Sequence, residues 1–314
     1  CQRQQRMRSD VLKIVTWNVA SLRAAWRKGL PQFIQKSQPD IVCLQETKMY
    51  VGANPSIESL VIEGYHGYFN NAEKKGYAGT AVFTKIKPLS ISKCSDIITD
   101  PNGRCLMIEF SNFVILNTYV VNAGEGTLKN LQYKIEDFNP KLEQLLDHLH
   151  NVTEIKQETI NSNSEFHPPI GKLVIWTGDL NVAHNAIDIW SVNHNDNRAG
   201  FTNDERKWFD HLIQDKHYID IFRMLYPNKQ QFSYFEQKIQ ARKSGKGMRI
   251  DYFVVRKDRL DSFNGSGSSV VIDCAINTTC DSISDHNPVI LALDKTKLLT
   301  SQDQIVEDFS NESI

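Results

Sequence analysis

Short runs of apolar residues, many of them β-branched, recur along the chain and are separated by polar segments. Residues 12–17 alternate between apolar and polar types, which is the pattern of a strand. Similar runs predict further strands at 40–44, 78–84, 105–110, 113–121, 172–177, 250–255, 270–275 and 288–293. Strands are therefore expected in both halves of the chain.

Helical patterns lie between some of these strands. Residues 131–149 carry leucines at helical spacing, and a shorter helix is predicted at 29–35. Thr202 and Glu205 have the spacing of a capping box, in which each side chain accepts a hydrogen bond from the other residue's backbone amide. A third helix is therefore predicted to begin after Thr202.

The order of these elements predicts the fold class and the number of domains. Helices interspersed among strands and hairpin-like pairs favour an α/β fold with two mixed β-sheets packed face to face and helices outside. The polar residues 151–169 are predicted to be a surface loop inserted in a single domain at 11–296. Residues 1–10 and 297–314 are predicted to be a flexible N-terminal segment and a flexible tail outside the fold.

Composition narrows the function classes. Hydrophobic residues make up 40% and charged residues 23% of the chain, which argues against a disordered protein or a fibre. The net charge of -1 provides no global positive field, so a nucleic-acid partner would need a locally basic face. No apolar run approaches the ~20 residues that span a bilayer, so no membrane association is expected. Cys43 lies in an apolar run and is predicted to be a buried hydrophobe, which indicates a reducing compartment.

Compact polar groups lie at the ends of several predicted strands, where such folds usually place their sites. These groups are Trp17-Asn18, Gln45-Glu46, Gly178-Asp179-Leu180-Asn181, Asp251 and Ser284-Asp285-His286. Their acids and amides are hard oxygen ligands of the kind that Mg²⁺ prefers. Each group alone could be an ordinary turn or helix cap, because Gly, Asp and Asn favour turns. Their combination predicts a site that uses a metal ion and acts on phosphate.

Five motifs occur in the order found in exonuclease III-type AP endonucleases. They are Leu44-Gln-Glu-Thr-Lys48, Thr118-Tyr-Val-Val-Asn-Ala-Gly124, Gly178-Asp-Leu-Asn-Val-Ala-His184, Arg249-Ile-Asp-Tyr-Phe253 and Ser284-Asp-His286. The Asp-Leu-Asn and Ser-Asp-His motifs alone specify only the wider endonuclease/exonuclease/phosphatase superfamily. Residues 199–206 (Ala-Gly-Phe-Thr-Asn-Asp-Glu-Arg) are similar to its DNA-repair branch. The resemblance extends from about residue 12 to residue 293.

This resemblance implies a four-layered, DNase I-like α/β-sandwich that hydrolyses a DNA phosphodiester 5′ to an abasic site and leaves a 3′-hydroxyl. It is also compatible with 3′→5′ exonuclease and 3′-phosphodiesterase activity. By the matching positions, Glu46 would hold Mg²⁺, with Asn18 and Asp285 supporting the metal site, and Mn²⁺ could substitute. The implied partner is double-stranded DNA that contains abasic sites.

The catalytic roles also come from the resemblance. Asp179 would orient or deprotonate the attacking water, and Asn181 would help to hold the water and the phosphate. His286, paired with Asp251, would bind a phosphate oxygen, because an adjacent aspartate favours the imidazolium form. The further phosphate contacts would be Tyr119 and Asn122.

Expected DNA contacts are more widely spread. The basic residues Arg242, Lys246 and Arg249 form a stretch that leads into Asp251, and we expect them to contact phosphates. Lys74-Lys75 is expected to be a solvated charged face. The resemblance implies a pocket for the flipped-out abasic sugar lined by aromatic residues. The other residues implied to bind DNA or line that pocket are Arg23, Lys48, Tyr77, Tyr234, Phe235 and Met248.

Three positions depart from the family pattern. Ala20 stands where the family has Asp or Asn, which predicts weaker or altered dependence on a divalent metal. Glu125 stands where many relatives have an arginine, and its carboxylate would repel phosphate. Met248 replaces a tryptophan of the animal enzymes beside the sugar pocket, and this flexible side chain predicts looser selectivity.

Two other kinds of function remain open on the sequence. The same catalytic set would serve a retroelement-type nicking endonuclease or a phosphatase acting on a small phosphoester. A non-catalytic DNA-damage-binding protein is less consistent with the sequence, because Glu46, Asp179, Asn181 and His286 are all retained. We expect a monomer in a reducing intracellular compartment: the nucleus if the source is eukaryotic, with the mitochondrion as the alternative.

Overall fold

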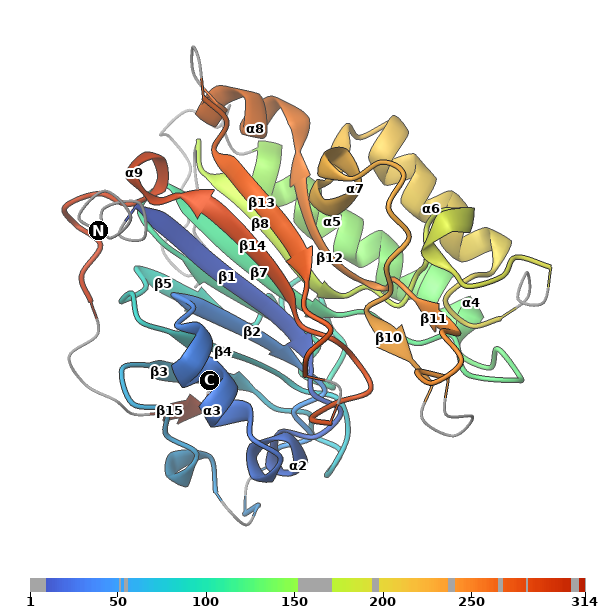
Figure 1. The fold of residues 1–314 in the computed structure, drawn as a ribbon, viewed down its shortest axis with the longest axis horizontal. Coiled ribbons are helices and arrows are strands. Elements are labelled where there is room, and N and C mark those ends of the chain that lie inside the picture. Colours follow the sequence, from blue (N-terminus) through green and yellow to red (C-terminus); the bar gives the residue numbers. More distant parts are fainter. Residues whose placement is uncertain are drawn as a thin grey trace.

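Two β-sheets lie face to face, and helices cover the outer face of each sheet (Figure 1). The computed structural model describes residues 10–50, 52–53, 56–151, 171–193, 198–236, 241–264, 268–280, 282–305 and 311–313. The four-layered α/β-sandwich predicted from the sequence is confirmed. Residues 1–9 of the predicted N-terminal segment and all but the first residue of the predicted 151–169 loop lie outside the described residues.

The first sheet has the strand order β13-β14-β1-β2-β4-β3-β15. These strands are β13 (Val271–Ile276), β14 (Val289–Asp294), β1 (Val11–Asn18), β2 (Ile41–Gln45), β4 (Thr80–Thr84), β3 (His66–Asn70) and β15 (Asn311–Ser313). The pairs β1–β2 and β3–β15 are parallel and the other pairs are antiparallel, so the sheet is mixed.

The second sheet has the order β5-β6-β7-β8-β12-β9. Its strands are β5 (Ser90–Ser92), β6 (Cys105–Glu109), β7 (Phe113–Tyr119), β8 (Leu173–Asp179), β12 (Asp251–Arg256) and β9 (Tyr218–Asp220). Only β7 and β8 run parallel within it. A separate short hairpin is formed by β10 (Tyr234–Phe235) and β11 (Gly247–Met248).

Helices α2 and α3 contribute to the cluster on the outer face of the first sheet, and α5 and α6 to the cluster on the outer face of the second. The helices are α2 (Leu22–Arg27), α3 (Leu30–Ser37), α4 (Leu131–Tyr133), α5 (Asn139–Asn151), α6 (Asn203–Gln214), α7 (Ile221–Leu225), α8 (Lys257–Asn264) and α9 (Lys295–Leu298). The predicted helix at 131–149 is interrupted by a π-helical segment, Lys134–Phe138. The predicted capping box of Thr202 and Glu205 is confirmed at the start of α6.

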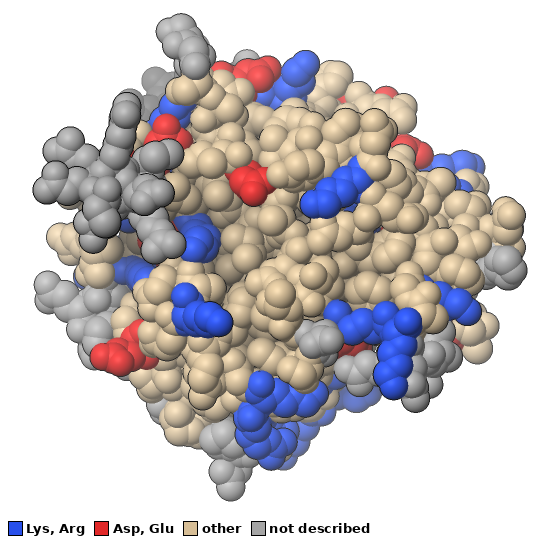
Figure 2. Space-filling model, in the orientation of Figure 1, with Lys and Arg blue, Asp and Glu red and all other residues tan. Residues whose placement is uncertain are grey.

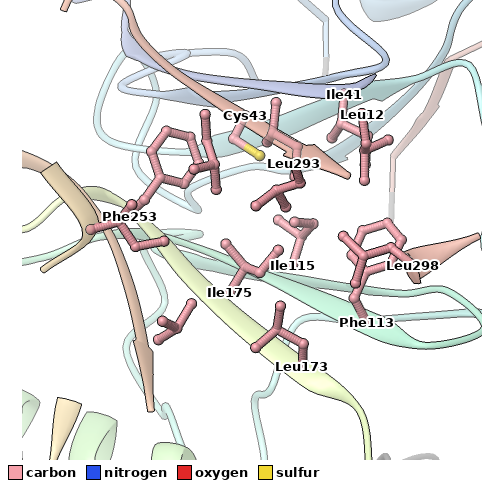
Figure 3. Packing of buried hydrophobic residues seen from close by; sticks show 14 of the residues in the cluster. Leu12, Ile41, Cys43, Phe113, Ile115, Leu173, Ile175, Phe253, Leu293 and Leu298 are labelled. Atoms are coloured by element: carbon pink, nitrogen blue, oxygen red, sulfur yellow. The ribbon is translucent and has the colours of Figure 1, made fainter. Parts of the chain in front are cut away.

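Alternating side chains on the central strands explain why both sheet faces are buried. On β1, Leu12 and Ile14 point into the cluster between the sheets, whereas Val15 and Trp17 pack toward α2 and α3. The period of two along a strand produces this division. Figure 3 shows side chains of both sheets meeting in the central cluster, among them Cys43, which is fully buried as predicted.

The C-terminal segment corrects one prediction. Residues 297–314 do not simply trail outside the fold, because Leu298 is buried and Ile305 forms a bridge with Ile86. Strand β15 then pairs with the edge strand β3. Edge strands have unpaired backbone groups, and pairing with the tail satisfies those of β3.

Within the described residues, no helix is long and apolar enough to cross a membrane.

Candidate active site

The predicted polar groups converge at one edge of the sandwich. Asn18 ends β1 and Glu46 follows β2, its parallel neighbour. In the second sheet, Asp179 at the end of β8 lies opposite Asp251 at the start of β12 and beside Tyr119 at the end of β7. Strand pairing therefore brings together residues that are far apart in the sequence.

A close approach between two strands helps to place Asp179. Gly178 has a φ of +133° and lies opposite Thr118 in the β7–β8 pair. A Cβ atom at Gly178 would lie 1.9 Å from the Thr118 carbonyl oxygen. Only glycine is compatible with this contact, so the Gly-Asp-Leu-Asn motif begins with a steric requirement of the sheet.

His286 and Asp251 form a buried ion pair. The Nδ1 atom of His286 lies 2.8 Å from Oδ2 of Asp251, and its Nε2 atom lies 3.9 Å from Oδ2 of Asp179. Burial lowers the pKa of His286, but the Asp251 carboxylate and its hydrogen bond outweigh burial and raise that pKa to about 10. At neutral pH His286 is therefore an imidazolium whose Nε2–H can be offered to an anion.

Asp179 is buried, and its pKa is lower than that of His286. Its Oδ2 atom accepts a hydrogen bond from Asn18 Nδ2 at 2.8 Å, and its Oδ1 atom accepts one from the Asn181 amide at 2.9 Å. Burial, followed by the charge of Asp251, raises the pKa of Asp179 to about 7. A carboxyl group with this pKa can accept a proton from water near neutral pH.

Glu46 is an ionised carboxylate beside Asp179. Burial opposes its ionisation, but the Lys48 ammonium 2.9 Å away and hydrogen bonds from Asn18 and Tyr119 lower its pKa. Asn18 Nδ2 donates to both Glu46 and Asp179, so one amide holds the two acids in a fixed relation.

Asn181 is held from two sides by groups of the site. Its Oδ1 atom accepts a hydrogen bond from Asn122 Nδ2 at 2.8 Å. Its backbone carbonyl accepts one from Lys134 Nζ at 2.7 Å, and Lys134 forms an ion pair with Glu205 at 2.6 Å. Lys134 and Glu205 are fully buried, so this pair fixes the backbone of Asn181 against α6. The capping role of Glu205 was predicted from the sequence, whereas the role of Lys134 was not.

Backbone strain is concentrated around the same residues. Glu46, Lys48, Asn181 and Ala20 have φ values of +50°, +53°, +49° and +54°. Non-glycine residues rarely adopt this region, and such strain is often found at functional sites. Asn and Asp tolerate it better than Ala, which gives a conformational reason for the family's preference at the position of Ala20.

Arg104 supports the site and was not identified from the sequence. This buried residue donates to the Tyr119 carbonyl oxygen at 3.3 Å and to the Tyr77 hydroxyl at 2.9 Å. Its guanidinium also lies 4.9 Å from the centre of the Tyr119 ring and forms an ion pair with Asp100. The sequence does not predict this role, because Arg104 is a single arginine after the turn residue Gly103 and belongs to no recognisable motif.

The residues predicted to bind DNA near the first sheet are placed around the site. Lys48 pairs with Glu46, and Tyr77 is one of the more exposed aromatic residues. Arg23 lies over the ring of Tyr50, 5.5 Å from its centre. Figure 2 shows Lys and Arg side chains gathered near α2 and near the β10–β11 hairpin. This distribution provides the local basic face that a protein with a net charge of -1 would need.

The predicted DNA-binding residues of the β10–β11 hairpin and its loop differ in their burial and in their contacts. Tyr234 is half-buried, and its ring lies 4.8 Å from the ring of His286. Phe235 is half-buried and stacks against Arg242. Lys246 lies over the Trp190 ring. Met248 is buried in an apolar cluster, so only a small part of it could face a substrate.

Two arginines of the predicted phosphate-binding stretch have internal partners. Arg242 donates to Asn287 and to the backbone carbonyls of Ser284 and Asp285, so it braces the loop that carries His286. The prediction for Arg249 is wrong. Arg249 is fully buried and forms ion pairs with Asp188 at 2.8 Å and with Asp220 at 2.6 Å.

Acidic side chains of the site could hold a metal ion. Among the described residues, one group of three acidic or imidazole side chains has ligand atoms within 4.8 Å of one another, namely Asp179, Asp251 and His286. An imidazolium has no lone pair for a metal, so this group is better explained as an ion-paired triad. The carboxylates of Glu46 and half-buried Asp285, together with the amide oxygen of Asn18, offer the oxygen donors that hard cations require.

The burial of Arg249 predicts a structural role. Replacing it in Arg249→Met leaves Asp220 and Asp188 buried with fewer compensating charges, so the free energy of unfolding should fall by about 3 kcal/mol or more. Urea denaturation measures this change. Lys246→Met, a change of the same type near the surface of the hairpin, should alter stability by less than about 0.5 kcal/mol. Equal stability of Arg249→Met and the wild type would contradict the structural role.

The pKa of His286 depends on Asp251. Because the Asp251 charge raises this pKa to about 10, wild-type His286 should stay protonated as the pH rises through 8. In Asp251→Asn the opposing effect of burial remains, so the pKa should fall toward or below the ordinary value of about 6.5. The imidazole NMR signals, followed against pH in metal-free buffer, report this change. An unchanged titration in Asp251→Asn would contradict the ion pair.

Comparisons with known proteins identify the family. Residues 15–286 match the model of the Endonuclease/Exonuclease/phosphatase family. The chain is 34% identical to a DNA-(apurinic or apyrimidinic site) endonuclease of Dictyostelium discoideum, over 93% of this chain and 73% of that protein. It is also 34% identical to an exodeoxyribonuclease of Bacillus subtilis, over 90% of this chain and 99% of that protein.

Solved structures give the same result. The structure of an AP endonuclease from Leishmania major superposes with a TM-score of 0.73 at 30% identity, over 91% of this chain and 88% of that chain. An AP endonuclease from Archaeoglobus fulgidus has a TM-score of 0.71 at 25% identity, over 90% of this chain and 99% of that chain. The fold, the convergent acids and these similarities agree, and the chain belongs to the Endonuclease/Exonuclease/phosphatase family.

Proposed function

We propose that this protein is a metal-dependent AP endonuclease that hydrolyses the DNA phosphodiester 5′ to an abasic site and leaves a 3′-hydroxyl. The observation that carries this proposal is the pairing of Asp179 with His286, whose nearest side-chain atoms are 3.9 Å apart. One group can accept a proton near neutral pH, and the other is a buried cation. The similarity to AP endonucleases specifies the substrate class.

We propose the following roles for the side chains, and this geometry supports them. Asp179 accepts a proton from the attacking water, while Asn181 orients the water and a phosphate oxygen. His286 donates Nε2–H to a phosphate oxygen because Asp251 keeps the ring protonated. Phosphoryl transfer depends mainly on such positioning and charge neutralisation. Tyr119 and Asn122 are proposed as further phosphate contacts, and their hydrogen bonds to Glu46 and Asn181 support this by keeping both side chains beside the site.

We propose Mg²⁺ as the cation, with Mn²⁺ able to substitute, held by Glu46 together with Asn18 and Asp285. Bound there, the cation would supply neutralisation of the negative charge that develops on the phosphate oxygens. The donor set supports this choice because it consists of oxygen ligands, which suit Mg²⁺ and Mn²⁺ better than softer metals.

Incision of a defined duplex tests the function. A duplex with one abasic analogue should be cut on the 5′ side of the lesion with Mg²⁺ and not with chelator, while an undamaged duplex should stay intact. Asp179→Asn should retain binding to abasic DNA but lose several orders of magnitude in turnover, because it cannot accept the proton. The surface change Asp137→Asn is a matched control and should keep full activity.

Other outcomes would favour the alternatives. Equal nicking of the undamaged duplex would favour a retroelement-type endonuclease, and release of phosphate from a small phosphoester without DNA incision would favour a phosphatase. Tight binding without incision would favour a non-catalytic DNA-damage-binding protein. Near wild-type incision by Asp179→Asn would remove Asp179 from the role assigned here.

The metal requirement should respond to position 20. Ala20→Asp adds a carboxylate next to the turn in which the Ala20 amide donates to Asn18 Oδ1. It also suits the positive φ of this residue better than alanine does. The Mg²⁺ concentration for half-maximal incision should therefore fall. Ala20→Asn, which fits the same backbone without adding charge, separates the conformational effect from the electrostatic one. An unchanged Mg²⁺ requirement in Ala20→Asp would contradict this role.

We further infer a monomer in a reducing compartment, the nucleus if the source is eukaryotic, or else the mitochondrion. The five cysteines described in the structure are buried, as expected for thiols that act as small hydrophobes, and this supports a reducing environment. Size-exclusion chromatography with light scattering tests the oligomeric state, and imaging of the tagged protein tests the compartment.

A further inference from the structure

Three charged residues form an ion-pair cluster at the rim of the site. Nη2 of Arg198 lies 2.7 Å from Oε2 of Glu236 and 3.7 Å from Oε1 of Glu125. The side chain of Arg198 is 18% exposed, that of Glu236 is 23% exposed and that of Glu125 is 50% exposed. We call these three residues the rim clamp.

The rim clamp joins loops that carry residues of the site. Glu125 lies three positions after Asn122, whose side chain donates to Asn181. The loop of Arg198 is tied to the segment after Asn181, because the Gly200 carbonyl accepts from the Ala183 amide at 2.6 Å.

The third loop belongs to the β10–β11 hairpin, which lies near α4 and α6 in Figure 1. Glu236 directly follows this hairpin's first strand, and Tyr234 on that strand contacts His286. The carboxylates of the rim clamp are close enough to Tyr234 to help raise the pKa of its hydroxyl, after burial and Asp285. The rim clamp therefore lies next to the residues proposed to bind phosphate.

The charge of the rim clamp is unfavourable for DNA as it stands. Two carboxylates and one guanidinium give it a net charge of -1, and duplex DNA carries one negative charge per ~1.7 Å of helix axis. A phosphate that approached this rim would be repelled unless Arg198 exchanged one of its partners for the phosphate.

Glu125 is the partner that can be exchanged. Its distance from Arg198 is longer than that of Glu236 by an ångström, and its side chain is the most exposed of the three. Exposed ion pairs of this kind are weak, whereas an arginine binds phosphate through charge-assisted hydrogen bonds. Glu236, which accepts a hydrogen bond from Arg198, would keep the guanidinium in place.

We propose that Arg198 binds a DNA phosphate and that Glu125 competes with this phosphate, so that the rim clamp weakens the binding of duplex DNA. This inference rests on the proposed function, because it requires DNA to cross this rim. Because this competition weakens the binding of abasic and undamaged duplex alike, contacts at the lesion must provide a larger share of the affinity for abasic DNA.

Equilibrium binding in the presence of chelator tests the proposal without hydrolysis. In fluorescence anisotropy, Glu125→Gln should bind both abasic and undamaged duplex about fivefold more tightly than the wild type, as expected for removing one competing charge. Its affinity should also depend more steeply on salt, with the slope of log K against log salt changing by about 1 for one additional phosphate contact.

A double-mutant cycle separates competition from simple repulsion. Arg198→Gln should weaken DNA binding. Adding Glu125→Gln to Arg198→Gln should restore little of the lost affinity, because the guanidinium for which the carboxylate and the phosphate compete is gone. Asp261→Asn on α8, an exposed position away from the site, makes the same change in net charge and should leave affinity unchanged. An equal gain from Glu125→Gln with and without Arg198, or from Asp261→Asn, would overturn the proposal.

The two proposals fail in distinguishable ways. Additive effects in the cycle, with Mg²⁺-dependent incision of abasic DNA by the wild type, would overturn the rim clamp alone. A coupled effect on DNA binding without such incision would support the rim clamp and overturn the endonuclease function. Thermal unfolding of each variant verifies that the changes in affinity are not caused by loss of folded protein.

Discussion

The site depends on the stabilisation of several buried acids within a few ångströms of one another. Asp179 and Asp251 lie at opposite positions of two paired strands, and both are almost fully buried. Two carboxylates that are this close and buried away from water repel each other, so they cannot both be charged without a neighbouring cation. His286 provides that cation, and the neighbouring carboxylates raise its pKa. The pKa of Asp179 rises for a different reason, because burial and the charge of Asp251 outweigh the lowering effect of His286. The ion pair and the catalytic properties therefore have one physical origin.

The sheets supply the rigid frame that this electrostatic arrangement needs. Asp179 and Tyr119 are fixed by parallel pairing, and the absence of a side chain at Gly178 lets the two strands approach. Behind the site, two buried ion-pair systems hold the loops: Lys134 with Glu205, and Arg249 with its two aspartates. Such pairs add little net stability, but removing one partner is costly, so they select a single loop arrangement.

The sequence was sufficient to predict the sandwich, the capping box and a group of polar residues at strand ends, because each leaves a local pattern. Alternation along β1 predicts a strand, and polar groups at strand ends predict a site. It was not sufficient for Arg249, whose partners Asp188 and Asp220 are 61 and 29 positions away. A basic stretch looks the same whether its residues face solvent or buried acids. Leu298 and β15 were missed for a similar reason, since the polar residues around them dominate the composition of the tail.

The internal use of basic residues has a consequence for DNA binding. Arg249 and Lys134 form ion pairs inside the fold. Arg198 and Lys48 form ion pairs with carboxylates at the site. In a chain with a net charge of -1, the attraction of DNA from a distance then comes from other basic residues, such as those gathered near α2 and near the β10–β11 hairpin (Figure 2). Nonspecific affinity for duplex comes mainly from phosphate contacts, so pairing the cations internally lowers it. Discrimination between damaged and undamaged DNA then depends more on what happens at the lesion, where the buried triad and the aromatic hairpin lie.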